Sequence, residues 1–126
     1  VNVGFGCTVS PRVELGDHSS LGNRCVIQAG VRIGSDLMMG PDVKIYTRNH
    51  AIQDLTIPMR MQGNDFSPVM IGDDVWIACN VVILPGVTIG SHSVIGAGSI
   101  VTPDVPEYAV VAGNPARIIK FRTAQN

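Results

Sequence analysis

Residues 71–101 read IGDDVWIACNVVILPGVTIGSHSVIGAGSIV, and an aliphatic side chain recurs in them at every sixth position. The same period runs through residues 1–50. A fixed short period is the signature of a repeat protein, in which each unit packs on the next. The complete series has fourteen members: Val3, Val9, Leu15, Leu21, Ile27, Ile33, Met39, Ile45, Ile71, Ile77, Ile83, Ile89, Ile95 and Val101.

Two further features define the six-residue unit. A second set of smaller side chains lies two positions before each aliphatic residue, and a spacing of two places both sets on one side of a strand. Stacked units of this kind form a prism with a continuous core, so the repeat predicts an all-β fold of short stacked strands. Glycine follows the aliphatic residue in eight units, where we expect corners with tight turns or unusual dihedral angles. These glycines are Gly4, Gly16, Gly22, Gly34, Gly40, Gly72, Gly90 and Gly96.

Length and composition predict one domain whose ligand is a small molecule or a protein. The 126 residues, 45% of them hydrophobic, are enough for a single core over 1–126. A net charge of -1 with scattered Lys and Arg gives no basic stripe for nucleic acid or an anionic membrane. No apolar run approaches the roughly 20 residues of a membrane helix, and no secretory signal is recognisable, so we expect a cytoplasmic protein.

The period is interrupted once. From Ile45 to Ile71 is twenty-six residues, which is not a multiple of six, so we expect residues 51–70 to leave the prism as an extruded loop. Loops of this length in a compact repeat are usually functional. The loop begins directly after His50, and the last hexad is followed by a short C-terminal tail at 103–126.

The repeat, together with GNPARIIK at 113–120, resembles the hexapeptide-repeat acyltransferase family. The resemblance implies that three hexads form one coil of a triangular, left-handed parallel β-helix, and that the protein is a homotrimer. Because the sequence starts inside a hexad without a capping element, we expect upstream residues or another subunit to cover that end.

A second resemblance concerns the chemistry. The loop fragment with Ile57-Pro58 and Gln62-Gly63 before Pro68-Val69 resembles capsule-type acetyltransferases. The segment YTRNH at 46–50 is similar to the Tyr-Thr-x-x-His stretch of sugar O-acetyltransferases of the maltose and galactoside type. In those enzymes the histidine deprotonates the acceptor hydroxyl, which implies His50 as general base in a direct transfer from acetyl-CoA. Imidazole suits this role because it titrates near working pH.

The family resemblance also implies where acetyl-CoA binds. In the family the pantetheine arm lies between subunits along outward positions of successive coils, and cations near the coil end meet the phosphates. Cys79 departs from the serine, glycine or alanine that is usual at this position in the family. The resemblance also implies that no metal takes part in the chemistry. The implied acetyl-CoA-binding residues are Cys79, Ala97, Thr102, Pro115, Arg117 and Lys120.

Three residues are candidates for binding the acceptor. Trp76, the sole tryptophan, occupies an outward position, and we expect it to brace the loop or the acceptor site. Asn23 falls near the place where galactoside acetyltransferases carry an acceptor-binding asparagine. Asp54, in the loop, has the chemistry to bind sugar hydroxyls.

The remaining histidines and cysteines suggest structural roles. His18 and His92 occupy outward positions and are expected to be solvated. Cys7 and Cys25 lie one coil apart, within reach of a disulfide, but packing as two small core thiols is the simpler interpretation.

Several functions share this fold and stay open at this stage. They are a xenobiotic O-acetyltransferase, an amino-sugar N-acyltransferase, a γ-carbonic-anhydrase-like protein and a non-enzymatic scaffold. The carbonic anhydrase needs three converging histidines, two of them five residues apart, and the three histidines of this chain lack that spacing. A scaffold would not need the histidine-bearing interruption.

Overall fold

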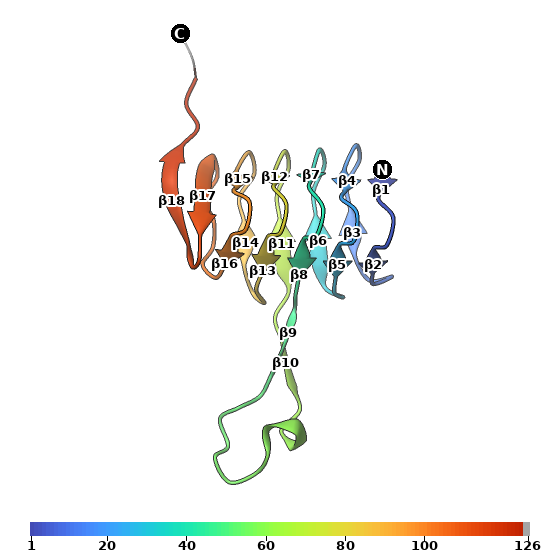
Figure 1. The fold of residues 1–126 in the computed structure, drawn as a ribbon, viewed down its shortest axis with the longest axis vertical. Helices are drawn as coiled ribbons and strands as arrows, with labels where there is room; N and C mark the ends of the chain where they lie inside the picture. The colour runs from blue at the N-terminus through green and yellow to red at the C-terminus, as the bar shows by residue number, and fades with distance from the viewer. Residues whose placement is uncertain (125–126) are drawn as a thin grey trace.

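The computed structural model describes residues 1–124 as a stack of coils with three faces made of short parallel strands (Figure 1). The parallel β-helix predicted from the repeat and from the family resemblance is confirmed. The first face contains β1 (Asn2–Val3), β4 (Ser20–Leu21), β7 (Met38–Met39), β12 (Trp76–Ile77), β15 (Val94–Ile95), β17 (Ala109–Gly113) and β18 (Ala116–Phe121). The second face contains β2 (Thr8–Val9), β5 (Val26–Ile27), β8 (Lys44–Ile45), β13 (Val82–Ile83) and β16 (Ile100–Val101). The third face contains β3 (Glu14–Leu15), β6 (Val31–Ile33), β11 (Val69–Ile71) and β14 (Thr88–Ile89).

The strand register shows how the hexads add up. On the second face Thr8 pairs with Val26 and Val26 pairs with Lys44, so one coil takes eighteen residues, or three hexads. Lys44 then pairs with Val82, and this coil is therefore twenty residues longer than the others on the face. The extra residues form a ribbon that projects from the prism between β8 and β11 (Figure 1).

The core follows the predicted period from Leu21 onward. Ile45, Ile77 and Ile83 have no exposed side-chain surface, and the smaller set between them is buried as well. At the N-terminal end the period continues but burial does not: Val3 and Val9 are 55% and 38% exposed. No coil within residues 1–124 lies beyond them to cover their side chains.

The backbone conformation at the corners differs from our expectation for the glycines. The eight glycines after the inward aliphatic residues do not have positive φ; they allow close approach between coils, and a Cβ on Gly22 would overlap the carbonyl group of Gly40. Left-handed conformations come two residues later and often fall on residues with side chains, such as Asp74 (φ 53°) and His92 (φ 64°). Asp, Asn and His tolerate this conformation better than most side chains do.

The C-terminal segment is more than the tail that we expected. Strand β17 continues the first face in parallel with β15, and β18 returns antiparallel to it. Val105, Ala109, Val111 and Ala116 are buried, so residues 105–116 extend the core over the end of the prism. Residues 125–126 of the predicted tail lie outside the described chain.

Cys7 and Cys25 are free thiols, as the simpler interpretation predicted. The Cys7 thiol donates a hydrogen bond to the Gly22 carbonyl oxygen over 3.1 Å. Burial, together with the neighbouring Cys7 thiol, raises the pKa of Cys25 to about 12. Cys25 therefore behaves as a small core residue at neutral pH.

Candidate active site

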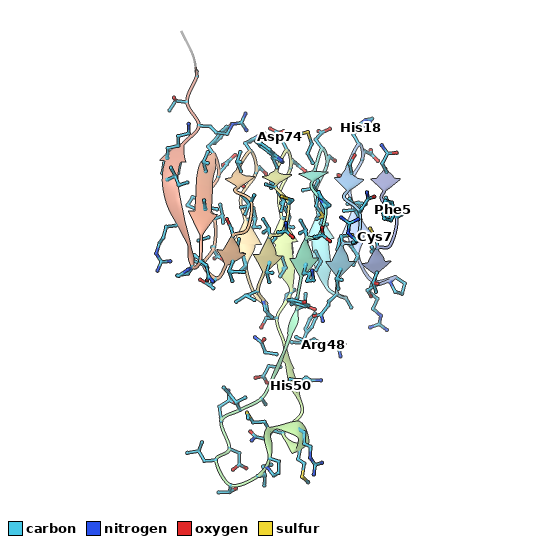
Figure 2. The ribbon with its side chains drawn as sticks, viewed as in Figure 1. Phe5, Cys7, His18, Arg48, His50 and Asp74 are labelled. Atoms are coloured by element: carbon cyan, nitrogen blue, oxygen red, sulfur yellow. The ribbon has the colours of Figure 1, made fainter. Side chains whose placement is uncertain are left out.

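His50 lies on an antiparallel ribbon outside the prism. The ribbon consists of β9 (Arg48–His50) and β10 (Asn64–Phe66), and its tip carries a short 3₁₀ turn, η1 (Met59–Met61). The predicted loop boundaries, 51–70, are therefore shifted: the chain leaves the prism at residue 48, and Val69 and Met70 already pair with β6 on the third face. The histidine projects with the ribbon instead of lying at a prism corner (Figure 2).

Two polar side chains hold the base of the ribbon. The Thr47 hydroxyl is buried and donates to the Ala29 carbonyl oxygen over 2.6 Å. The Gln28 side-chain oxygen accepts hydrogen bonds from the backbone N–H groups of Thr47 and Arg48, at 2.8 and 3.2 Å. Sequence reasoning missed both residues, although a polar residue at the corner before an interruption is a signal that could have found them. The base of β9 is thus fixed, which limits where His50 can move.

The tip of the ribbon has its own hydrogen bonds. Asp54 Oδ1 accepts from the Thr56 hydroxyl at 2.6 Å and from the Thr56 N–H at 2.9 Å. The Thr56 hydroxyl and N–H hold the pKa of Asp54 below its ordinary value. The carboxylate that we considered for the acceptor therefore already stabilises a turn.

Residues on one side of the ribbon accompany His50. Residues two apart on a strand share a face, so Arg48 and His50 project to the same side. Their cross-strand partners are Phe66 and Asn64, respectively, and directly paired residues also share a face. His50 is exposed, and its ring makes no hydrogen bond within residues 1–124.

Trp76 points outward, as predicted, but it does not brace the ribbon of its own chain. It is on β12 of the first face, whereas the ribbon leaves the corner between the second and third faces. Figure 2 shows the separation, because Asp74, at the corner leading to β12, lies on the opposite side of the prism from His50. Trp76 instead borders a hollow of about 520 Å³ together with Met38, Val94 and other residues.

Two of the predicted acetyl-CoA-binding residues lie one above the other in the structure. Cys79 and Ala97 lie on successive coils at the corner after the first face, where the Gly98 N–H donates to the Cys79 carbonyl oxygen over 2.9 Å. The β17–β18 turn, with a cis peptide before Pro115, is held near this corner by a hydrogen bond from the Gly113 N–H to Ser99 Oγ over 3.2 Å. The region beside Gly98 is open, since a Cβ added there would have no atom within 4 Å.

The other predicted acetyl-CoA residues are not gathered with them. Thr102 follows β16 and lies at the corner after the second face. Arg117 borders a hollow of about 310 Å³ formed with Val105 and Ala116, whereas Lys120 borders the first-face hollow beside Trp76. In a single chain the two cations therefore face different cavities.

Asn23 has a structural role in the described chain. Its side-chain oxygen accepts a hydrogen bond of 3.0 Å from the Phe5 N–H on the preceding coil. A Cβ on Gly4 would overlap Asn23, so the two corners are closely packed. The structure does not bring Asn23, Asp54 and Trp76 together within one chain.

His92 differs from the prediction of a solvated side chain. Its Nδ1 lies 2.8 Å from Asp74 Oδ2, and its ring stacks on that of Tyr108 with centroids 4.8 Å apart. His18 is exposed, as expected. Within residues 1–124 no three His, Cys, Asp or Glu side chains gather as a metal site, and no helix there has the length and apolarity to cross a lipid bilayer.

Comparison with known proteins identifies the family. The model "Bacterial transferase hexapeptide (six repeats)" matches residues 68–103, and "Hexapeptide repeat of succinyl-transferase" matches residues 1–35. A galactoside O-acetyltransferase of Escherichia coli is 46% identical over 91 residues, which cover 71% of this chain and 43% of that protein.

Two solved structures are similar over nearly the whole chain. One is a maltose O-acetyltransferase from Clostridium difficile 630 (38% identity, 98% of this chain and 67% of that chain, TM-score 0.89). The other is a hexapeptide-repeat acetyltransferase from Vibrio cholerae complexed with acetyl coenzyme A (37% identity, 94% and 64%, TM-score 0.84). The chain spans about half the length of the curated relatives it matches. Repeat models match both halves of the prism, and the chain is 38% identical to the Clostridium enzyme and covers two thirds of that enzyme. The chain therefore belongs to the hexapeptide-repeat acetyltransferase family.

Proposed function

We propose that the protein is an acetyl-CoA-dependent O-acetyltransferase that acts on a hydroxyl of a sugar or a polysaccharide precursor. The observation that carries the proposal is the position of His50, an exposed imidazole on a ribbon with a fixed base, in the sequence context YTRNH. The maltose and galactoside acetyltransferases among the relatives support a sugar as acceptor. Use of acetyl-CoA, a cytoplasmic metabolite, supports action in the cytoplasm.

The proposed reaction is a direct transfer. The acceptor oxygen attacks the thioester carbonyl while His50 takes the hydroxyl proton, so a C–O bond forms as the C–S bond breaks. The imidazolium then returns the proton to the departing CoA sulfur, which leaves as a free thiol. No covalent acyl-enzyme is needed, because the thioester is already activated and both substrates are held together.

The row formed by Cys79 and Ala97 suits a thin pantetheine chain. Both side chains are small, and the space beside Gly98 is open, so an extended ligand can approach the backbone of successive coils. Pro115 lies at the turn next to this row. We assign Thr102, Arg117 and Lys120 to the nucleotide end of acetyl-CoA on the family resemblance.

A homotrimer would complete the site. Within one chain Trp76 lies on the first face, whereas His50 is on the ribbon that leaves the corner between the other two faces, so a shared site needs two copies. The ribbon supports this assembly because it exposes an apolar surface, with Leu55 95% exposed, and monomeric proteins rarely expose large apolar patches. The exposed apolar side chains at the tip of the ribbon are Ile52, Leu55, Ile57, Met59 and Met61.

The test is acetyl transfer to a panel of sugars, followed by release of free thiol. We expect His50→Ala to lower turnover by about 10²- to 10⁴-fold while acetyl-CoA binding is unchanged. Asn49→Ala is the matched control, because Asn49 is adjacent on β9 but projects to the other side of the ribbon. Normal turnover by His50→Ala would rule out His50 as the general base. Failure of the wild-type protein to bind acetyl-CoA would rule out the proposed activity.

A mixing experiment tests the shared site. Trimers of His50→Ala alone or Trp76→Ala alone should be impaired, whereas mixed trimers contain some interfaces in which both native residues meet. Partial recovery of turnover on mixing supports a site made by two subunits. No recovery from two well-folded, exchanging variants would contradict it.

A further inference from the structure

The base of the ribbon contains a hollow with a positively charged lining. Its volume is about 380 Å³, and it is bordered by Arg12, Ala29, Gly30, Arg48 and Phe66. Arg12 comes from the prism corner after the second face, and Arg48 begins β9 (Figure 2 labels Arg48). Two cations from different coils thus border one hollow that has no carboxylate in its lining.

Both guanidinium groups in this hollow lack a partner. Within residues 1–124 neither Arg12 nor Arg48 forms an ion pair or a side-chain hydrogen bond, although their backbone N–H groups are bonded. Other arginines of the chain are paired: Arg24 with Asp42, Arg32 with Glu14, and Arg122 with Asp74. The base of the ribbon thus brings together two arginines whose guanidinium groups have no partner within residues 1–124.

Phe66 provides an apolar wall beside these charges. Its ring lies over Gly30, which has φ +86°, and a Cβ on that glycine would overlap the ring. The ring is nevertheless 54% exposed, so one face is available to a ligand. A flat aromatic surface next to two guanidinium groups is suited to a sugar ring that carries an anionic group.

Arg48, which borders the hollow, precedes the proposed general base by two residues on β9. Arg48 and His50 share one side of β9, and two residues along a strand correspond to roughly 6.6 Å. Phe66 and Asn64 are their paired neighbours on the same side of β10. A sugar bound with its anionic group at Arg48 would thus have hydroxyls within reach of His50.

We propose that Arg12, Arg48 and Phe66 form an acceptor subsite for sugars that carry a phosphate or carboxylate group. The inference rests on the proposed acetyl transfer and adds the charge of the acceptor to it. The arginines bind the anion through paired N–H donors, and Phe66 packs against the sugar ring. The attraction between these exposed charges weakens as ionic strength rises.

The test compares glucose 1-phosphate, glucuronate and neutral glucose. Binding is measured by calorimetry on the assembled protein without acetyl-CoA, and kcat/KM is measured with it. We expect at least one anionic sugar to bind tenfold or more tightly than glucose at low salt. Whether the phosphate or the carboxylate sugar binds more tightly identifies the natural anion.

The variants are Arg12→Gln, Arg48→Gln and Arg48→Lys. Each Gln variant should weaken binding of the anionic sugar by about tenfold or more without changing glucose binding, and Arg48→Lys should recover part of the loss. Arg60→Gln, in η1 of the same ribbon, makes the same change in net charge and should have no effect. Circular dichroism confirms that each variant is folded.

Two outcomes separate this proposal from the proposed function. Equal binding of glucose and both anionic sugars, or an equal loss in Arg60→Gln and Arg48→Gln, overturns the anionic subsite and leaves acetyl transfer standing. Selective binding that depends on Arg48, without transfer from acetyl-CoA to any sugar, supports the subsite and overturns the acetyltransferase activity.

Discussion

His92 Nδ1 lies 2.8 Å from Asp74 Oδ2, and the two residues occupy the same corner on successive coils. Arg122, at the end of the hairpin formed by β17 and β18, donates to the His92 carbonyl oxygen over 2.8 Å and lies 3.6 Å from Asp74. Tyr108 stacks on the His92 ring. This cluster therefore fastens the C-terminal hairpin to the stack of coils.

The first prediction concerns acid stability. The hydrogen bond from His92, aided by the Arg122 charge, holds the pKa of Asp74 below its ordinary value. A lowered pKa stabilises the fold above the ordinary Asp pKa of about 3.9 and stops doing so as the pH falls through the lowered value. Because Asp74 is about half exposed, the contribution should be below about 1 kcal/mol. We expect Asp74→Asn to be less stable than wild type at pH 7, with a difference that shrinks by pH 3 in urea unfolding.

Asp65→Asn, on the ribbon, removes the same charge away from this cluster and serves as the control for that series. A stability difference between wild type and Asp74→Asn that stays constant from pH 7 to pH 3 would contradict the role of the Asp74 charge.

The second prediction separates two effects of a glycine substitution. Gly30 has φ +86° and Gly63 has φ +80°, so alanine at either position should cost about 1–2 kcal/mol of backbone strain. Only at Gly30 would the new Cβ overlap the Phe66 ring, whereas Gly63 has open space around it. Gly30→Ala should therefore lower the free energy of unfolding more than Gly63→Ala and shift the Phe66 ring resonances. Identical effects of the two substitutions would show that Phe66 does not pack on Gly30 in solution.

The third prediction concerns the anchor of the ribbon. The buried Thr47 hydroxyl bonds to the Ala29 carbonyl oxygen, so Thr47→Val keeps the side-chain shape but leaves a buried acceptor without its partner. We expect a loss of about 1–3 kcal/mol in the free energy of unfolding. Thr47→Ser retains the hydroxyl and should be less destabilised. If Thr47→Ser has a lower free energy of unfolding than Thr47→Val, packing of the methyl group and not the hydrogen bond stabilises the base of the ribbon.

The fourth prediction uses the three thiols. At pH 8 iodoacetamide should modify Cys25 last, because it is fully buried and its pKa is raised to about 12. Cys79 is partly exposed on the proposed pantetheine row, and acetyl-CoA should slow its modification. Mass spectrometry of the digested protein follows each site. Modification of Cys79 at the same rate with and without acetyl-CoA would exclude it from the binding surface.

Sequence reasoning predicted the prism well because each inward position is set by a short local period. Ile77 and Ile83 are buried where the repeat placed them, and Cys7 and Cys25 stack one coil apart. It failed at the corners: glycine after the inward residue serves close approach between coils, and His92 has neighbours that come from other coils. Such contacts join residues fifteen or more apart, and a hexad by itself carries no information about them.

The candidate site was only partly predictable for the same reason. The interruption pointed to His50, but not to a ribbon that begins at Arg48 and pairs it with Phe66. Nor did the sequence indicate that Arg117 and Lys120 would border different hollows.

The sequence by itself determined the coil, its core and the place of the interruption, because burying one aliphatic side chain in every six residues requires stacked strands. Only the tertiary structure decided which outward residues meet. Their neighbours depend on how many residues each corner and insertion contains, and the twenty-residue insertion brings Arg48 and Phe66 to a hollow that Arg12 also borders.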